Sequence, residues 1–162
     1  MNAPRRGGGW VIVVSLVGAL VLAVVPLPES VDLLRPPWAL LVIIYWVLAL
    51  PERVGVGVAW CSGLLVDVLR STLLGAHGFA FALVAWLTMK LHQRLRVFPL
   101  WQQAFTVLLL TLLVRVLLFW LDGITGQPEV GWQHWLPAPT AAVVWPLVFV
   151  FLREMRRRFN VR

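Results

Sequence analysis

Two charged residues lie inside apolar stretches of this chain. Their types and positions say more about possible chemistry than those of any other residues in the sequence. Asp67 lies about thirteen residues into the stretch 54–70, and Arg115 lies about fifteen residues into the stretch 100–121. On helices these positions are roughly 20 and 22 Å from the start of each segment, so the two charges fall at similar depth. A charge inside a bilayer costs about 2.5 to 3.5 kcal/mol even on a lenient scale, so each needs a partner. We therefore predict an ion pair between Asp67 and Arg115.

Other interpretations of the two charges stay open. Arg70 is three residues after Asp67 on the same helical face and is a local rival for the carboxylate. Arg115 can also extend its side chain outward to the membrane surface. A proton relay through Asp67 is a further possibility, although transporters usually show additional carboxylates within the membrane.

The sequence contains none of the common enzyme or metal-binding motifs. The chain has no HExxH, GxSxG, Walker or glycine-rich dinucleotide pattern, and its three histidines, His77, His92 and His134, lack metal-ligand spacing. We expect no catalytic activity, no metal and no cofactor.

The stretch that positions Asp67 carries small residues at helical spacing. Gly55, Ala59 and Gly63 precede Asp67 at intervals of four residues, so all four lie on one face of a helix. Small residues allow close approach of another helix in lipid, where packing and interhelical hydrogen bonds drive association. This face is predicted to pack against another helix of the chain or against a partner.

Composition identifies an integral membrane protein with a single transmembrane domain over residues 1–162. Of these residues 60% are hydrophobic and 13% are charged, and the mean hydropathy is +0.86, which is more apolar surface than one soluble core can bury. The predicted fold is an all-α, six-helix transmembrane bundle, with apolar segments at about 10–25, 33–50, 54–70, 76–91, 100–121 and 136–152. The strictly apolar part of the second segment covers only about 20 Å, so the segment either includes Leu33 and Leu34 upstream or is a re-entrant or half-buried element.

Basic residues set the predicted orientation. With the amino terminus in the cytoplasm, eleven of the fourteen lysine and arginine residues face the cytoplasm, including those in the end segments 1–9 and 153–162. The positive-inside rule therefore favours an even number of crossings with both ends inside. With a net charge of +7, the protein is expected to attract anionic lipids to its basic surface. Nucleic acid is not expected, because no basic groove with interleaved aromatic residues is present.

Three blocks of the sequence resemble the rod shape-determining protein family MreD of Gram-negative bacteria. They are RPPWALLVIIYWVLALPERVGVG at 35–57, GLLVDVLRSTLLGAHGFAFAL at 63–83 and KLHQRLRVFPLWQQA at 90–104. With the length and the number of segments, the resemblance covers about residues 10 to 155. The family's aspartate in the second block corresponds to Asp67, and the glycine of its LLGAHG motif corresponds to Gly75; neither has a catalytic role in the family.

The resemblance implies a non-enzymatic, inner-membrane subunit of the cell-elongation machinery, which supports lateral peptidoglycan synthesis. The implied partners are MreC, through its single membrane helix, together with MreB, RodA and a class B penicillin-binding transpeptidase. The family's fold is also similar to the six-helix substrate-binding subunits of energy-coupling-factor transporters, a likeness that alone would not establish transport. Two alternatives remain: a small-molecule-binding subunit of a transporter, which needs a cavity with convergent polar groups, and a lipid-handling enzyme.

Overall fold

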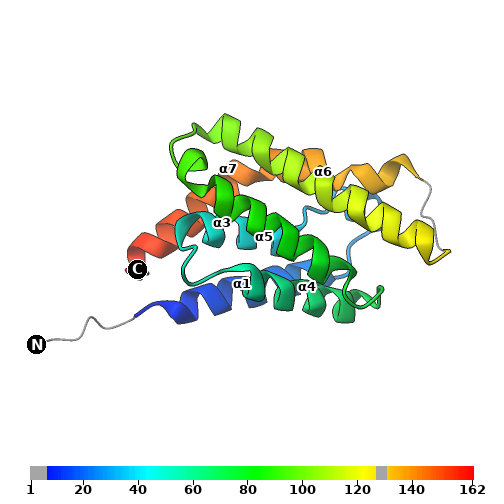
Figure 1. Ribbon diagram of the computed structural model, residues 1–162, viewed down its shortest axis with the longest axis horizontal. Helices are drawn as coiled ribbons and strands as arrows, with labels where there is room; N and C mark the ends of the chain where they lie inside the picture. Colours follow the sequence, from blue (N-terminus) through cyan, green and yellow to red (C-terminus); the bar gives the residue numbers. More distant parts are fainter. Residues whose placement is uncertain (1–6, 127–130) are drawn as a thin grey trace, which may run out of the picture.

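The protein is all-helical over the part of the chain that the computed structural model describes, residues 7–126 and 131–162. No strand occurs in these two ranges. Figure 1 shows long helices running along one common direction. The elements are α1 (Gly9–Val24), α2 (Glu29–Asp32), α3 (Trp38–Ala49), α4 (Val56–Arg70), α5 (Ala76–Leu95), α6 (Leu100–Ile124), the 3-10 helix η1 (Trp132–Trp135) and α7 (Pro137–Arg158).

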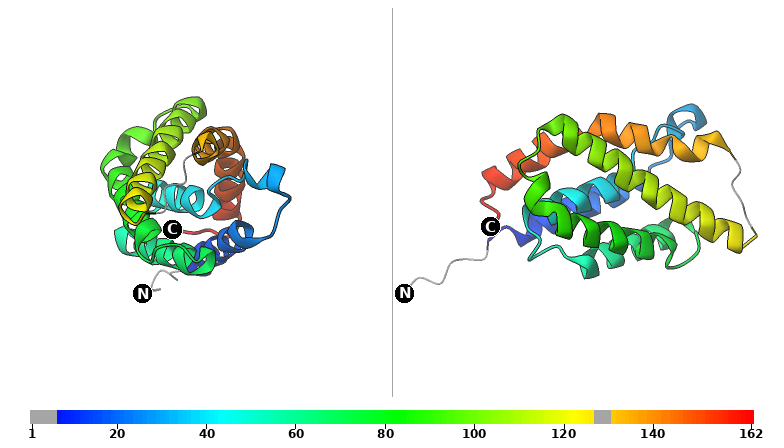
Figure 2. Two further views of the ribbon diagram at one scale, coloured as in Figure 1. Left: turned by 90° about the vertical axis from the view of Figure 1, so that its right-hand side faces the viewer. Right: turned by 45° about the horizontal axis from the view of Figure 1, so that its top comes forward.

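Helix α3 is the core of the molecule. Every residue after its first is buried, and the end-on view in Figure 2 shows the other long helices arranged around it. Its 12 residues span roughly 18 Å, which is less than the thickness of a bilayer core. The helix begins at Trp38, directly after Pro36 and Pro37, because a proline restricts the preceding residue to extended conformations. Leu33 therefore lies outside it, in the turn that follows α2.

Two long apolar elements meet the length and composition requirements for crossing a membrane. They are Leu100–Ile124, with 25 residues, and the continuous run Trp132–Arg158, with 27. A buried polar network ties them together, since the Trp145 indole donates to the Gln103 side-chain oxygen at 3.3 Å. The Gln103 amide in turn donates to the carbonyl oxygens of Leu95, at 2.9 Å, and Phe98, at 3.2 Å. The network thus supplies hydrogen-bond donors to two backbone carbonyl groups near the α5–α6 turn that the helices themselves do not satisfy.

Helices α4 and α5 form the closest pair. A Cβ atom built on Gly63 of α4 would lie 2.5 Å from the Gly78 Cα and 2.5 Å from the His77 carbonyl oxygen, so only glycine fits there. Backbones in such close contact gain many van der Waals contacts without help from large side chains.

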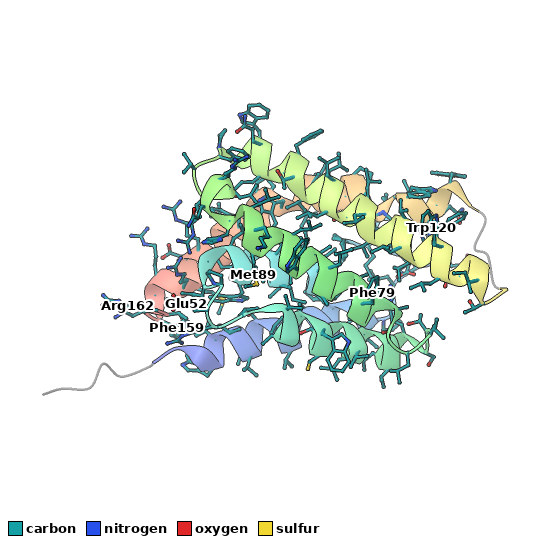
Figure 3. All side chains as sticks on the ribbon, viewed as in Figure 1. Glu52, Phe79, Met89, Trp120, Phe159 and Arg162 are labelled. Atoms are coloured by element: carbon teal, nitrogen blue, oxygen red, sulfur yellow. The ribbon has the colours of Figure 1, made fainter. Side chains whose placement is uncertain are left out.

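Both described ends of the chain lie at the same end of the molecule. The Trp10 ring packs edge-on against Phe159 at 4.9 Å between centroids, and Gly8 lies against Val161. Figure 3 places Phe159, Glu52 and Arg162 at this end, with Trp120 toward the opposite end. We call the end that contains Trp10 and Phe159 the terminal end, and the opposite end the distal end.

Candidate functional site

Asp67 lies near the carboxyl end of α4 and is only 1% exposed. Its Oδ1 accepts hydrogen bonds from the Thr72 hydroxyl at 2.9 Å, from the His77 backbone N–H at 3.1 Å and from the His77 ring nitrogen Nδ1 at 2.7 Å. Its Oδ2 accepts from the backbone N–H groups of Gly75, at 2.9 Å, and Gly78, at 3.4 Å. Five donors around one carboxylate offset the cost of removing its charge from water.

The loop between α4 and α5 has the backbone conformation that brings these donors together. Helix α4 ends at Arg70, and the next residue, Ser71, adopts the left-handed region with φ 53°. The Thr72 N–H donates to the Asp67 carbonyl oxygen at 3.0 Å. Gly75 has φ +100° and immediately precedes α5. The first N–H groups of α5 then point at the carboxylate, so Asp67 acts as the amino-terminal cap of the neighbouring helix.

The sequence predicted a different partner for this carboxylate. The ionisable side chain of His77 lies 2.7 Å from the Asp67 carboxylate. Arg70 and Arg115 both line the same cavity as His77 and act electrostatically on its ring. A direct Asp67–Arg115 ion pair thus stays a prediction.

The small residues singled out in the sequence have separate roles. Gly63 lies at the α4–α5 contact, and Ala59 is fully buried in the bundle. Gly55 caps the start of α4, with no atom within 4 Å of a Cβ built on it. Gly75 supplies the positive φ in the loop and donates its N–H to Asp67. These placements explain packing within the chain; contact of any of them with a partner remains a prediction.

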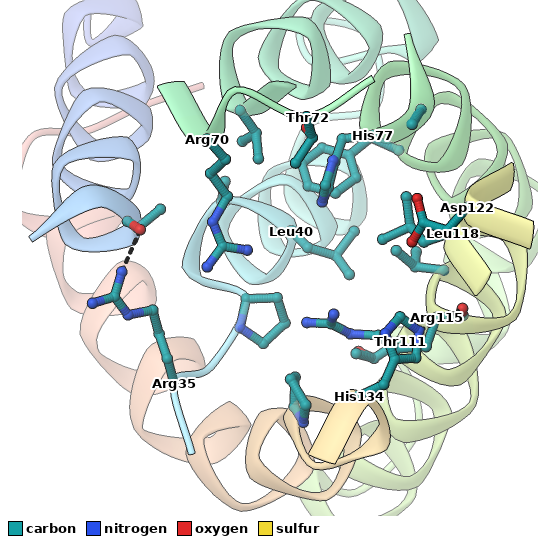
Figure 4. Close-up of a pocket in the computed structure, with 18 of the residues that line it drawn as sticks. Arg35, Leu40, Arg70, Thr72, His77, Thr111, Arg115, Leu118, Asp122 and His134 are labelled. Atoms are coloured by element: carbon teal, nitrogen blue, oxygen red, sulfur yellow. Dashed lines mark hydrogen bonds between the residues drawn. The ribbon is translucent and has the colours of Figure 1, made fainter. Parts of the chain in front are cut away.

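A large cavity opens beside this loop, at the distal end. Its volume is about 840 Å³, and residues from the α1–α3 connection, α4, α5, α6 and the start of α7 line it. Figure 4 shows the Arg70 and Arg115 guanidinium groups pointing into the cavity, with Leu40 of α3 at its floor. The 3-10 helix η1 is held at its rim, because His134 Nε2 donates to the Arg115 carbonyl oxygen at 3.0 Å. A cavity with convergent polar groups is the feature that a small-molecule site requires.

Sequence reasoning missed several of the residues that complete these sites. His77, Thr72 and Gly78 bind Asp67 from the next loop and helix. The available signal was the glycine-flanked GAHG motif after a helix end, which is typical of a helix start with nearby polar partners. Among the described residues no group of three or more histidine, cysteine, aspartate or glutamate side chains is arranged to hold a metal.

Two arginines, Arg96 and Arg35, cap the carboxyl ends of helices. Arg96 donates from Nε and a terminal nitrogen to the carbonyl oxygens of Leu48 and Ala49, both at 2.8 Å. Arg35 donates to the Ala23 and Val25 carbonyl oxygens at the end of α1 and forms an ion pair with Asp32 at 2.9 Å. Cations at these positions satisfy open carbonyl groups and match the negative end of the helix dipole.

Comparisons with known proteins agree with the sequence resemblance. The family model described as rod shape-determining protein MreD matches residues 4–155. Rod shape-determining protein MreD of Haemophilus influenzae is 33% identical over 153 residues, which cover 94% of each chain. No solved structure matches the chain, so the likeness to energy-coupling-factor transporter subunits stays a prediction. The family match over nearly the whole chain, on an all-helical fold with two helices able to cross a membrane, shows that this chain is a membrane protein of the MreD family of rod shape-determining proteins.

Proposed function

We propose that this protein is a non-enzymatic scaffold subunit of the rod complex in the bacterial inner membrane. It holds the transmembrane helix of MreC and lies beside MreB, RodA and a class B penicillin-binding transpeptidase, and so supports cell shape and lateral peptidoglycan synthesis. The observation that carries the proposal is the match of residues 4–155 to the MreD family.

The proposed arrangement has six membrane helices and both ends of the chain in the cytoplasm. The two described ends lie together, as an even number of crossings requires. The terminal end also carries the basic cluster Arg153, Arg156, Arg157 and Arg158 near the end of α7, which fits the cytoplasmic side by the positive-inside rule. Helix α3 is too short to span on its own, and its enclosure by the other helices accounts for its place in the bundle.

The outward side of α1 and α4 is the face we assign to the MreC helix. The two helices contact each other and lie side by side in Figure 1. Gly18 and Gly57 are exposed, and a Cβ built on either meets no atom within 4 Å. Around them are Val14, Val17 and Cys61, also exposed. Trp60 of α4 is exposed as well, whereas α7, whose outward side includes Leu147 and Phe151, contains no glycine. Small exposed residues favour close approach of a second helix in lipid.

Co-purification from native membranes tests the proposal. Gly18→Leu and Gly57→Leu place a bulky side chain on the α1–α4 face without disturbing internal packing, and we expect them to reduce the amount of MreC recovered by about tenfold, as a loss of about 1.4 kcal/mol in binding would. Val143→Leu is the matched control, because Val143 is 76% exposed on α7. Equal recovery of MreC with all three variants would contradict the assigned face, and substrate turnover by the purified protein would contradict the scaffold function.

A further inference from the structure

The cavity at the distal end has the size of a ligand site and a lining of mixed character. Its volume of about 840 Å³ is within the range of small-molecule and cofactor pockets, about 300 to 1,000 Å³. Apolar residues, including Trp38, Phe81 and Leu118, line part of it, and charged residues line the rest. The helix packing and capping described above leave this space unexplained.

Positive groups dominate the charged part of the lining. Arg35, Arg70 and Arg115 line the cavity, against the carboxylates of Asp32 and Asp122. Asp32 is paired with Arg35. Asp67, which lies behind the wall, is bonded to the α4–α5 loop and to His77. A guanidinium has five N–H donors in a planar fork, so Arg70 and Arg115 can each bind an anion while they hold another contact.

Two further features of the wall and floor favour an anion. The Arg35 side chain is 8% exposed, and its Nε is buried with no hydrogen-bond partner among the described residues. The floor is the start of α3, where Ala39 and Leu40 are buried and line the cavity, and no side chain caps the first turn of this 12-residue helix. The open N–H groups and the positive end of the helix dipole therefore face the same space as the arginines.

We propose that this cavity binds an amphiphilic ligand through its anionic group, a phosphate or a carboxylate. The anionic group lies between Arg70 and Arg115, above the first turn of α3, and the apolar part of the ligand lies against Trp38, Phe81 and Leu118. The His77 ring, held by its hydrogen bond to Asp67, forms part of the wall. The site is separate from the α1–α4 face, so its failure would leave the scaffold function intact.

Binding measurements on the purified full-length protein test the proposal and identify the source of the anion. The probes are inorganic phosphate added to protein in neutral detergent, and lipid nanodiscs of phosphatidylcholine alone or with phosphatidylglycerol. Thermal stabilisation and lipids retained in native mass spectrometry are the readouts. Stabilisation by phosphatidylglycerol alone would identify a lipid as the source of the anion, and stabilisation by phosphate as well would show that the anionic group is enough for binding; stabilisation by phosphate alone would contradict an amphiphilic ligand.

Four variants assign the binding to the cavity. Arg115→Gln and Arg70→Gln should each weaken binding by about tenfold or more, because each removes a charged hydrogen-bond donor, whereas Arg115→Lys should retain part of the affinity. Arg70 is exposed at the end of α4 and Arg115 is half-buried, so we expect the Arg70 substitution to affect the fold less than the Arg115 substitution does. Arg94→Gln, on the exposed side of α5 away from the cavity lining, is the control. Absence of stabilisation by every probe, or an equal loss with Arg94→Gln and Arg70→Gln, would overturn the proposal.

Discussion

At the residue scale, a buried carboxylate is held by hydrogen bonds from the chain that follows it. The Asp67 carboxylate accepts hydrogen bonds from three backbone N–H groups, a hydroxyl and a ring nitrogen, all of residues 72 to 78. Because these donors come from the α4–α5 loop and the first turn of α5, the carboxylate fixes the angle at which α5 leaves the loop. The role of Asp67 is thus structural, and it also orients His77 at the cavity wall.

Replacing Asp67 by asparagine should destabilise the protein by on the order of 2 to 3 kcal/mol, because the charge-assisted bonds are lost and the amide NH₂ opposes N–H donors. A double-mutant cycle with His77→Ala should give a coupling of about 1 to 2 kcal/mol. The measurement is the free energy of unfolding in mild detergent. A second cycle, which combines Asp67→Asn with Arg115→Gln, tests the predicted ion pair. Zero coupling between Asp67 and Arg115 would exclude that pair. A coupling larger than the one between Asp67 and His77 would contradict the role of Asp67 as a cap of α5.

Two glycines form a matched pair for testing close packing. Gly63→Ala should cost about 1 to 3 kcal/mol, because the new methyl group collides with the backbone of α5. Gly18→Ala meets no atom within 4 Å and should be neutral or stabilise by about 0.5 to 1 kcal/mol, since alanine is the better helix former. Thermal unfolding of both variants under identical conditions provides the comparison. A Gly63→Ala protein as stable as Gly18→Ala would show that α4 and α5 are farther apart than described.

At the scale of the elements, arginines close the ends of short helices. Arg96 reaches from the end of α5 to the last carbonyls of α3, and Arg35 reaches back to those of α1. Water cannot satisfy carbonyl groups at a buried helix end, so a side chain must do so. The short central helix therefore depends on a residue almost fifty positions away in the sequence.

Arg96→Gln is expected to destabilise the protein by about 1.5 to 3 kcal/mol, the worth of hydrogen bonds to a charged group. Arg94→Gln changes the same charge on the exposed side of the same helix and should change stability by less than about 0.5 kcal/mol. Chemical unfolding followed by tryptophan fluorescence, to which the buried Trp46 of α3 contributes, is the measurement. Equal stability of the two variants would show that α3 does not need this cap.

At the scale of the whole molecule, hydropathy locates the helices but not their polar contacts. Each of the six apolar segments overlaps one helix of 12 residues or more, because apolar runs between charged or proline-containing turns leave few alternatives. The short α2 was missed, and the predicted segment 33–50 begins before α3, which starts at Trp38 after the proline pair. The buried α3 matches the alternative of a half-buried element. The partners of Asp67 and Arg96 depend on how loops fold back, which depth along a helix does not describe.

Cross-linking from the native cysteine tests the central claim, that the protein acts by contact with another membrane helix on its α1–α4 face. Cys61 is the one cysteine of the chain and is exposed on α4, so a photoreactive maleimide attached to it probes this face directly. The control protein carries the same probe on Val143→Cys in a Cys61→Ser background. The account predicts a cross-link to the membrane helix of MreC from Cys61 and none from position 143. A cross-link to MreC from position 143 alone would contradict it.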